Sequence, residues 1–307
     1  MSSESTTLKT IAAVFPHSNH RSSLDIIRGI HRALRLFESS HRLIVLDTDD
    51  DDGELSAERE AEALKTVVRE GIAGAILWQV GGETSEAALA SILDAGVPVV
   101  CIDRYPVTTS CDYVGVDNRS GARYAVEYLM RLGHQRIVHF TLPDNDNEVH
   151  TSAVVERRLG FEEAMALRGI TTGSKQIYSD QAELLGLLRS ADENRPTAVF
   201  AVNDHSAANF VQEAAKLGLS VPEDFSIVGF DGLSSLWHPA AWLTTMNISF
   251  NDIGDRATEL LLRRISYPME PAAPRQHILL PTTLVPRTSC REITPSVPAL
   301  RSKSPNA

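Results

Sequence analysis

The chain has 307 residues, of which 43% are hydrophobic and 22% charged, as in an ordinary globular protein rather than a disordered or fibrous one. No apolar run approaches the ~20 residues of a membrane span, and the first residues lack the apolar core of a signal peptide, so we expect a cytoplasmic protein. The formal net charge is −11 and Lys and Arg form no cluster, which argues against nucleic-acid binding by the chain itself.

The first half of the chain alternates short apolar runs with helical stretches. β-Branched and apolar residues predict strands at Thr10–Phe15, Leu43–Leu46, Ala73–Trp78 and Val99–Ile102. Apolar periodicity predicts helices at 24–37, 55–69 and 85–95, the last closed by Gly96.

The same alternation restarts in the second half. We expect strands at 136–141, 198–202, 225–230 and 277–280, and helices at 120–132, 157–167, 206–217 and 253–264. Strands that alternate with helices form parallel sheets covered on both faces, and two such blocks predict an α/β protein with two doubly wound lobes. Ligands in this architecture bind beyond the carboxyl ends of the strands.

Motifs for catalysis and for metal binding are absent from the sequence. No Gly-x-Ser-x-Gly elbow and no phosphate-binding glycine loop occurs, so we expect no enzyme. Cys101, Cys111 and Cys290 show no metal-ligand spacing, and we expect neither a metal nor a cofactor. The acidic run at 47–52 lacks the ligand spacing of a calcium loop, which favours a solvated loop.

Several segments, in order, resemble one known family. These are Gly96–Arg104 (GVPVVCIDR), Tyr113–Asn118 (YVGVDN), Leu132–Ile137 (LGHQRI), Arg157–Phe161 (RRLGF), Pro196–Asp204 (PTAVFAVND), Val221–Asp231 (VPEDFSIVGFD) and Leu243–Thr245 (LTT). Together they are similar to the effector-binding domain of LacI/GalR-type bacterial transcription regulators. The resemblance covers about residues 9 to 290.

The resemblance implies the periplasmic-binding-protein type 1 fold, in which three crossover strands join two lobes, and a homodimer. We expect the crossovers near 116–117, 245–246 and 276. The N-terminal lobe would comprise residues 9–116 and 246–275, and the C-terminal lobe residues 117–245 and 276–290. We expect disordered tails at 1–8 and 291–307, the second being rich in Ser, Pro and Arg.

By the same resemblance, four polar residues contact the effector: Asp103, Arg157, Asn203 and Asp231. Carboxylates accept hydrogen bonds from sugar hydroxyls, a guanidinium donates in a fixed plane, and an amide does both. Structural roles are the alternatives. Asp103 could cap a helix or form a turn, Arg157 could pair with Glu156 or Glu162 on a helix surface, and Asp204 could cap the following helix.

The loop after the first strand departs from the family pattern. The aromatic pair that stacks on sugars is missing, and the polar residues His17, Asn19, His20 and Arg21 stand there instead. Beside a helix N-terminus, His20 and Arg21 could meet an acidic ligand such as a sugar acid or sugar phosphate, with an exposed polar loop as the alternative. Trp78 and Trp237 follow strands and could supply stacking or simple packing.

The resulting hypothesis is an allosteric sensor that binds a sugar, sugar acid or sugar phosphate between its lobes. DNA would be contacted through a separate module, because the nine residues before Thr10 are too few for a helix-turn-helix. That module could be of the LacI type or a GntR-type winged helix. The alternative is a solute-binding protein of the same fold that serves sugar uptake.

Overall fold

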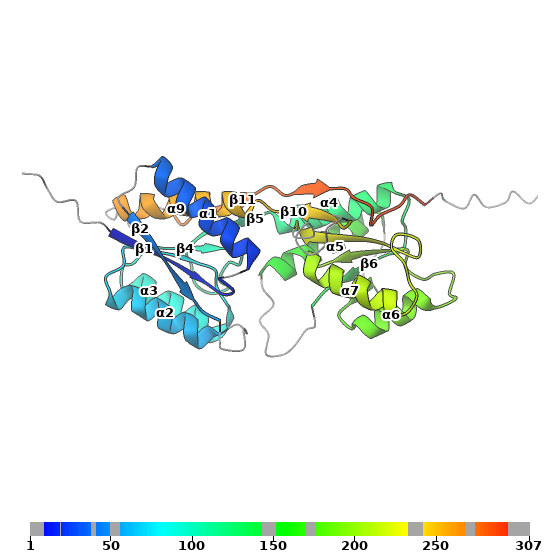
Figure 1. Cartoon of the computed structure of the whole chain (residues 1–307), viewed down its shortest axis with the longest axis horizontal. Helices are drawn as coiled ribbons and strands as arrows, with labels where there is room; N and C mark the ends of the chain where they lie inside the picture. The colour runs from blue at the N-terminus through cyan, green and yellow to red at the C-terminus, as the bar shows by residue number, and fades with distance from the viewer. Residues whose placement is uncertain are drawn as a thin grey trace, which may run out of the picture. The chain divides into compact units, whose positions relative to one another are not determined.

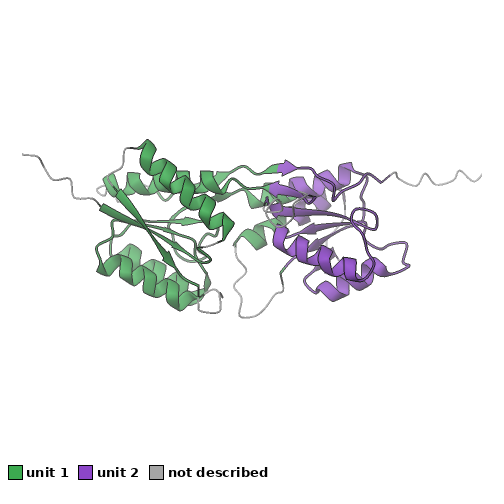
Figure 2. Cartoon of the chain, in the orientation of Figure 1, with its two compact units in different colours: residues 1–122, 142–160, 247–283 green, residues 123–141, 161–246, 284–307 purple. Residues whose placement is uncertain are grey.

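The computed structural model describes residues 9–18, 20–37, 41–49, 56–142, 152–169, 176–232, 242–267 and 274–293. They form two compact units (Figure 2), the first of residues 1–122, 142–160 and 247–283 and the second of residues 123–141, 161–246 and 284–307. Asn19 and Trp237 lie outside the described residues. No helix in the described ranges is long and apolar enough to span a bilayer.

The first unit is built on a six-stranded sheet of order β11-β5-β4-β3-β1-β2, and every pairing given for it is parallel. Its strands are β1 (Lys9–Phe15), β2 (His41–Asp47), β3 (Ala75–Leu77), β4 (Val99–Ile102), β5 (Asp112–Val116) and β11 (His277–Leu280). The central strands β3, β4 and β5 are buried along their whole length. Such continuously apolar runs are typical of a parallel sheet covered on both faces.

Two pairs of helices cover this sheet (Figure 1). They are α1 (Arg21–Leu36) with α9 (Phe250–Ser266), and α2 (Ala57–Arg69) with α3 (Gly82–Asp94). The first pair packs closely because a Cβ added at Gly29 would lie 2.0 Å from the Asn251 carbonyl oxygen, and one at Gly254 would lie 2.1 Å from that of Ile26. Only glycine permits this approach of two helix backbones.

The second unit repeats the plan with a sheet of order β12-β10-β9-β8-β6-β7. Its strands are β6 (Ile137–Phe140), β7 (Ile177–Tyr178), β8 (Ala198–Ala201), β9 (Ser226–Asp231), β10 (Thr244–Asn247) and β12 (Thr283–Val285). The helices α6 (Gln181–Arg189) and α7 (Asp204–Lys216) share an apolar cluster with Val138 and Phe140. On the opposite face, Phe161 of α5 (Ser152–Leu167) stacks on His139, and α5 packs against α4 (Asn118–Arg131).

The chain passes between the sheets three times, after β5, after β10 and between β11 and β12. The expected fold class, two doubly wound parallel-sheet lobes joined by three crossovers, is therefore confirmed. The expected lobe boundary at 276 is wrong, because β11 pairs with β5 through His277↔Tyr113 to Leu280↔Val116 and so belongs to the first sheet. The third crossover lies at residues 281–282.

Several helices begin earlier than their apolar periodicity indicates. α1 starts at Arg21 rather than Leu24, and α5 starts at Ser152 rather than Arg157. The first turns are mostly polar or small, and periodicity marks only the residues that pack on the sheet. The expected tail from 291 is also partly ordered, since the Ile293 amide donates to the Leu132 carbonyl at 2.8 Å and the Arg291 amide to Ser226 Oγ at 3.1 Å.

Candidate functional site

The carboxyl end of β4 holds Asp103 in a left-handed turn. Asp103 directly follows the strand and has φ = +61°, a conformation that few non-glycine residues adopt. Its amide donates to the Val114 carbonyl at 3.2 Å, and its own carbonyl accepts from the Tyr113 hydroxyl at 3.0 Å. Burial, and then the charge of Asp103, raise the pKa of Tyr113 well above its ordinary value, so this hydroxyl stays a donor.

Gly115 makes room for that hydroxyl. A Cβ added at Gly115 would lie 1.9 Å from the Tyr113 oxygen. The Tyr-x-Gly pattern in the segment 113–118 therefore has a local physical reason: the glycine admits the ring that supports the Asp103 turn.

Arg157 lies on α5 and is 5% exposed. Its Nε donates to Oδ1 of Asn118 at 2.8 Å, and Asn118 is itself buried and donates through Nδ2 to the Val116 carbonyl at 3.4 Å. The alternative of a surface arginine is therefore wrong. Gly160, one turn further along α5, permits this packing, because a Cβ there would lie 2.2 Å from the Arg119 carbonyl oxygen.

In the second unit, Asp231 ends β9 with φ = +99° and is half-buried. The amide of Gly232, which follows it, donates to Thr245 Oγ1 at 3.3 Å. In the described part of the chain, the non-glycine residues with positive φ are His17, Asp103 and Asp231, and all three are candidates from the sequence. Backbone strain of about 1–3 kcal/mol per residue persists where the surrounding structure enforces it, and it concentrates at ligand sites.

Asn203 caps α7, with its Oδ1 accepting from the Ser206 amide at 2.7 Å. The alternative in which Asp204 provides the cap is wrong. Asp204 is buried in the first turn and its Oδ1 accepts from the Thr245 hydroxyl at 2.7 Å. Capping uses the oxygen of the Asn203 side chain, and no bond from its Nδ2 to another described residue is present, so the amide can still donate to a ligand.

The loop after β1 is tied to β2 rather than open. His17 bonds to Asp49 through its backbone amide and through Nδ1, both at 2.8 Å, and Ser18 bonds to Asp47 through its hydroxyl. Burial raises the pKa of Asp47, but the bonds from Ser18 and from the Asp49 amide outweigh it and leave this pKa below its ordinary value. Asp47 is therefore an ionised anchor for the loop.

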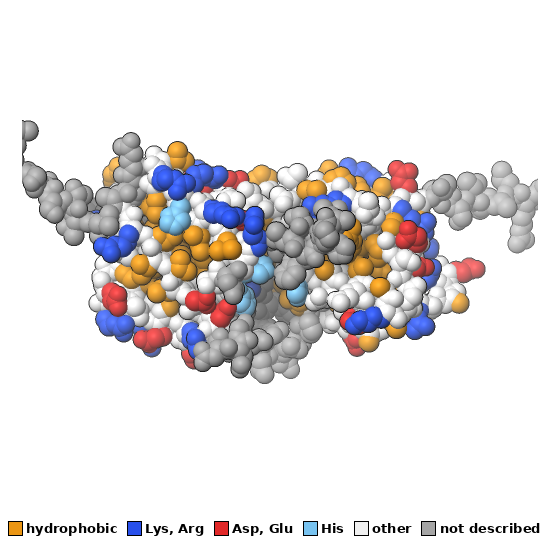
Figure 3. Space-filling model, in the orientation of Figure 1, with side chains coloured by type: hydrophobic (Ala, Val, Ile, Leu, Met, Phe, Trp, Pro, Cys, Tyr) orange, Lys and Arg blue, Asp and Glu red, His pale blue; other side chains and the backbone are white. Residues whose placement is uncertain are grey.

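His20 is the residue before α1, and its Nδ1 lies 2.7 Å from Ser22 Oγ. Figure 3 shows basic side chains gathered over α1. Within α1, Arg21 and Arg28 pair with Asp25 at 2.8 and 2.7 Å. Arg21 is thus balanced by a neighbouring carboxylate, and its role in ligand binding stays a prediction.

The structure adds polar groups that sequence reasoning missed. Arg104, next to Asp103, donates from Nη1 to the carbonyls of Gln79 and Val80 at 3.4 and 3.3 Å, and burial lowers its pKa.

Among the described residues, the buried Trp78 Nε1 has no hydrogen-bond partner. Its ring packs on Phe15 and Phe250, which favours the packing role for this tryptophan. No group of His, Cys, Asp or Glu in the described ranges is arranged to hold a metal ion.

Two doubly wound units, each with polar residues at the carboxyl ends of its strands, define a protein of the periplasmic-binding-protein type 1 fold. The family described as "Periplasmic binding protein-like domain" matches residues 126–290. The chain belongs to this family, as the effector-binding domain of a LacI/GalR-type regulator.

Curated relatives and solved structures agree with this assignment. The arabinose metabolism transcriptional repressor of Geobacillus stearothermophilus is 29% identical over 82% of this chain and 67% of its own length. The HTH-type transcriptional repressor PurR of Vibrio vulnificus is 27% identical over 84% of this chain and 75% of its own length. A LacI family transcriptional regulator from Enterococcus faecium, solved with bound ribose, is 26% identical with a TM-score of 0.71, covering 93% of this chain and 100% of that one.

Proposed function

We propose that this chain senses a small polar effector, a sugar or a sugar-like acid or phosphate, and thereby controls transcription. Asp103 and Arg157 of the first unit and Asn203 and Asp231 of the second would contact the same ligand. The observation that carries the proposal is the pair of strand-end carboxylates, Asp103 and Asp231, each held at a positive φ that few non-glycine residues adopt.

The chemistry of these groups suits a polyhydroxylated molecule. Carboxylates accept from neighbouring hydroxyls, the Asn203 amide donates, and the buried Arg157 is oriented by Asn118 so that its guanidinium plane is fixed. Relatives named as repressors, and a relative solved with ribose, support this reading.

The readout would be allosteric. A ligand shifts a conformational equilibrium only by its differential affinity for the two states, so effector bound by both units would favour one arrangement of a homodimer. That dimer would set the spacing of DNA-binding modules on an operator. The cytoplasm is the compartment in which such a regulator acts.

Thermal unfolding with D-ribose, L-arabinose, cellobiose, D-galacturonate and glucose 6-phosphate tests the proposal, because a ligand bound only by the folded state raises the melting temperature. We expect one of these to raise it, and Asp231→Asn to abolish that rise while the unliganded protein stays folded. Asp192→Asn, at an exposed turn of the same unit, is the matched control. An equal rise in the Asp231→Asn protein would exclude Asp231 from the site.

A further inference from the structure

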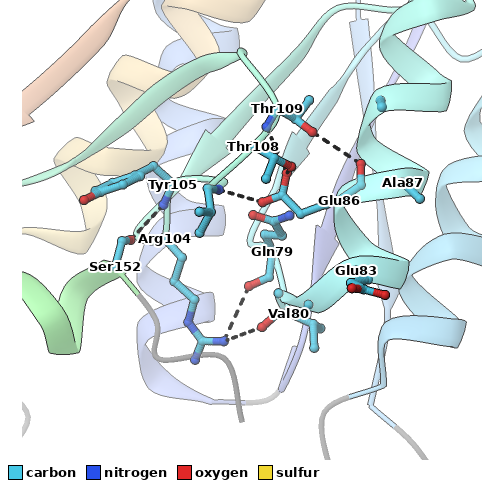
Figure 4. A pocket seen from close by; sticks show the side chains of 14 residues that line it. Gln79, Val80, Glu83, Glu86, Ala87, Arg104, Tyr105, Thr108, Thr109 and Ser152 are labelled. Atoms are coloured by element: carbon cyan, nitrogen blue, oxygen red, sulfur yellow. Dashed lines mark hydrogen bonds between the residues drawn. The ribbon is translucent and has the colours of Figure 1, made fainter. Parts of the chain in front are cut away.

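A cavity of about 480 Å³ lies within the first unit, between α3 and the segment 104–109 that follows β4 (Figure 4). Its volume is in the range that small-molecule sites occupy. None of the residues proposed to contact the effector lines it. The cavity is therefore a second candidate site, and it goes beyond the proposed function.

The Gln79 side chain points into this space and is 3% exposed. Among the described residues its Nε2 has no hydrogen-bond partner, although the backbone carbonyl of the same residue accepts from Arg104. A buried donor without an acceptor carries a free-energy cost, because it loses its bond to water and gains none in return. An acceptor supplied by a ligand would recover that cost.

Glu86 of α3 holds one wall, the segment 107–109, in place. Its carboxylate accepts from the Val107 amide at 2.6 Å, the Thr108 hydroxyl at 2.8 Å and the Thr109 amide at 3.0 Å. Burial alone would raise the pKa of Glu86, but the bonds from Thr109 and Thr108 outweigh it, and this pKa is lowered. The wall is thus fixed by an ionised side chain whose oxygens are already occupied.

The remaining lining is mostly apolar. Val80, Ala87, Ala90 and Val107 supply aliphatic surface, and Ala87 and Ala90 are one helical turn apart on α3. Glu83, at the rim, adds a second carboxylate. These carboxylates disfavour an anion, while a cation has no acceptor to offer to Gln79.

We propose that this cavity binds an uncharged, largely apolar small molecule whose single carbonyl oxygen accepts a hydrogen bond from Gln79 Nε2. Simple aryl ketones have this chemistry. Acetophenone is the probe, and benzoate and benzylamine are analogues of the same size with a negative and a positive charge.

Titration of the ¹⁵N-labelled chain, followed by amide chemical shifts, tests the proposal. Acetophenone is expected to shift the amides of residues 79–90 and 105–109 saturably, with benzoate and benzylamine at least tenfold weaker. Ala90→Leu, at a half-exposed helical position, fills the cavity and is expected to weaken binding by more than tenfold. Gln79→Leu keeps the volume, removes the donor, and is expected to weaken binding by roughly two- to tenfold, the range for one neutral hydrogen bond.

Ala215→Leu on α7 adds the same bulk at an exposed site of the other unit and should leave binding unchanged. Absence of saturable shifts, equal affinity for the charged analogues, or unchanged affinity in the Ala90→Leu protein would each overturn the proposal. The spectra also report whether each variant is folded. Because no sugar is used, the outcome does not depend on the proposed effector site.

Discussion

The turn that presents Asp103 depends on one hydroxyl, and Tyr113→Phe removes only that hydroxyl. The ring of Tyr113 is 1% exposed and packs edge-on to Tyr105 with centroids 5.5 Å apart, so phenylalanine would keep the packing. What is lost is the 3.0 Å bond to the carbonyl of Asp103, whose φ is +61°. The substitution therefore removes the hydrogen bond that supports the turn while leaving the Asp103 carboxylate in the chain.

The size of the effect follows from that single neutral bond, which contributes about 1 kcal/mol net. We expect the free energy of unfolding to fall by that amount and the melting temperature to fall by about 2 °C in a chain of this size. If the turn then relaxes toward an ordinary conformation, Asp103 no longer meets the ligand at the same angle. A loss of about 1 kcal/mol in binding corresponds to an affinity roughly fivefold lower.

Thermal unfolding and calorimetric titration with the sugar that stabilises the parent chain measure the two quantities separately. Tyr178→Phe, at a half-buried tyrosine of the second unit, is the control and should leave affinity unchanged. A Tyr113→Phe protein that is less stable but binds with unchanged affinity would refute the reasoning, because the turn would then be structural only.

Three further predictions concern other groups. Asn203→Asp keeps the helix cap, so it should retain stability while weakening effector binding severalfold. Asn203→Ala loses the cap as well and should lower the free energy of unfolding in urea by about 1 kcal/mol. Equal binding by the Asp variant and the parent would argue against the amide as a donor. Gly229→Ala places a Cβ 2.2 Å from Asp204 Oδ1 and should cost about 1–3 kcal/mol, and a stability equal to the parent's would contradict this. Burial raises the pKa of Glu60 above 4.5, so its ionised form costs stability at neutral pH; Glu60→Gln should be more stable than the parent at pH 7, by a margin that shrinks as pH falls toward 4.5. A margin independent of pH, in unfolding curves at several pH values, would contradict that assignment.

The sequence by itself determined the two-lobed α/β fold and the strands that carry the site. The continuous apolar runs of parallel strands can be recognised in the sequence alone, and β11 is predicted at its observed residues, 277–280. The positions of Asp103 and Asp231 at strand ends followed directly, since a polar residue after such a run must leave the sheet at its carboxyl end.

Only the tertiary structure decided the partners of the polar side chains. Arg157 bonds to Asn118, 39 residues away, and Asp204 bonds to Thr245, 41 residues away. The sequence also could not predict which sheet β11 joins, because its partner β5 lies far earlier in the chain. Hydrophobic periodicity is a local property, whereas the pairing of buried polar groups depends on which distant elements burial brings together.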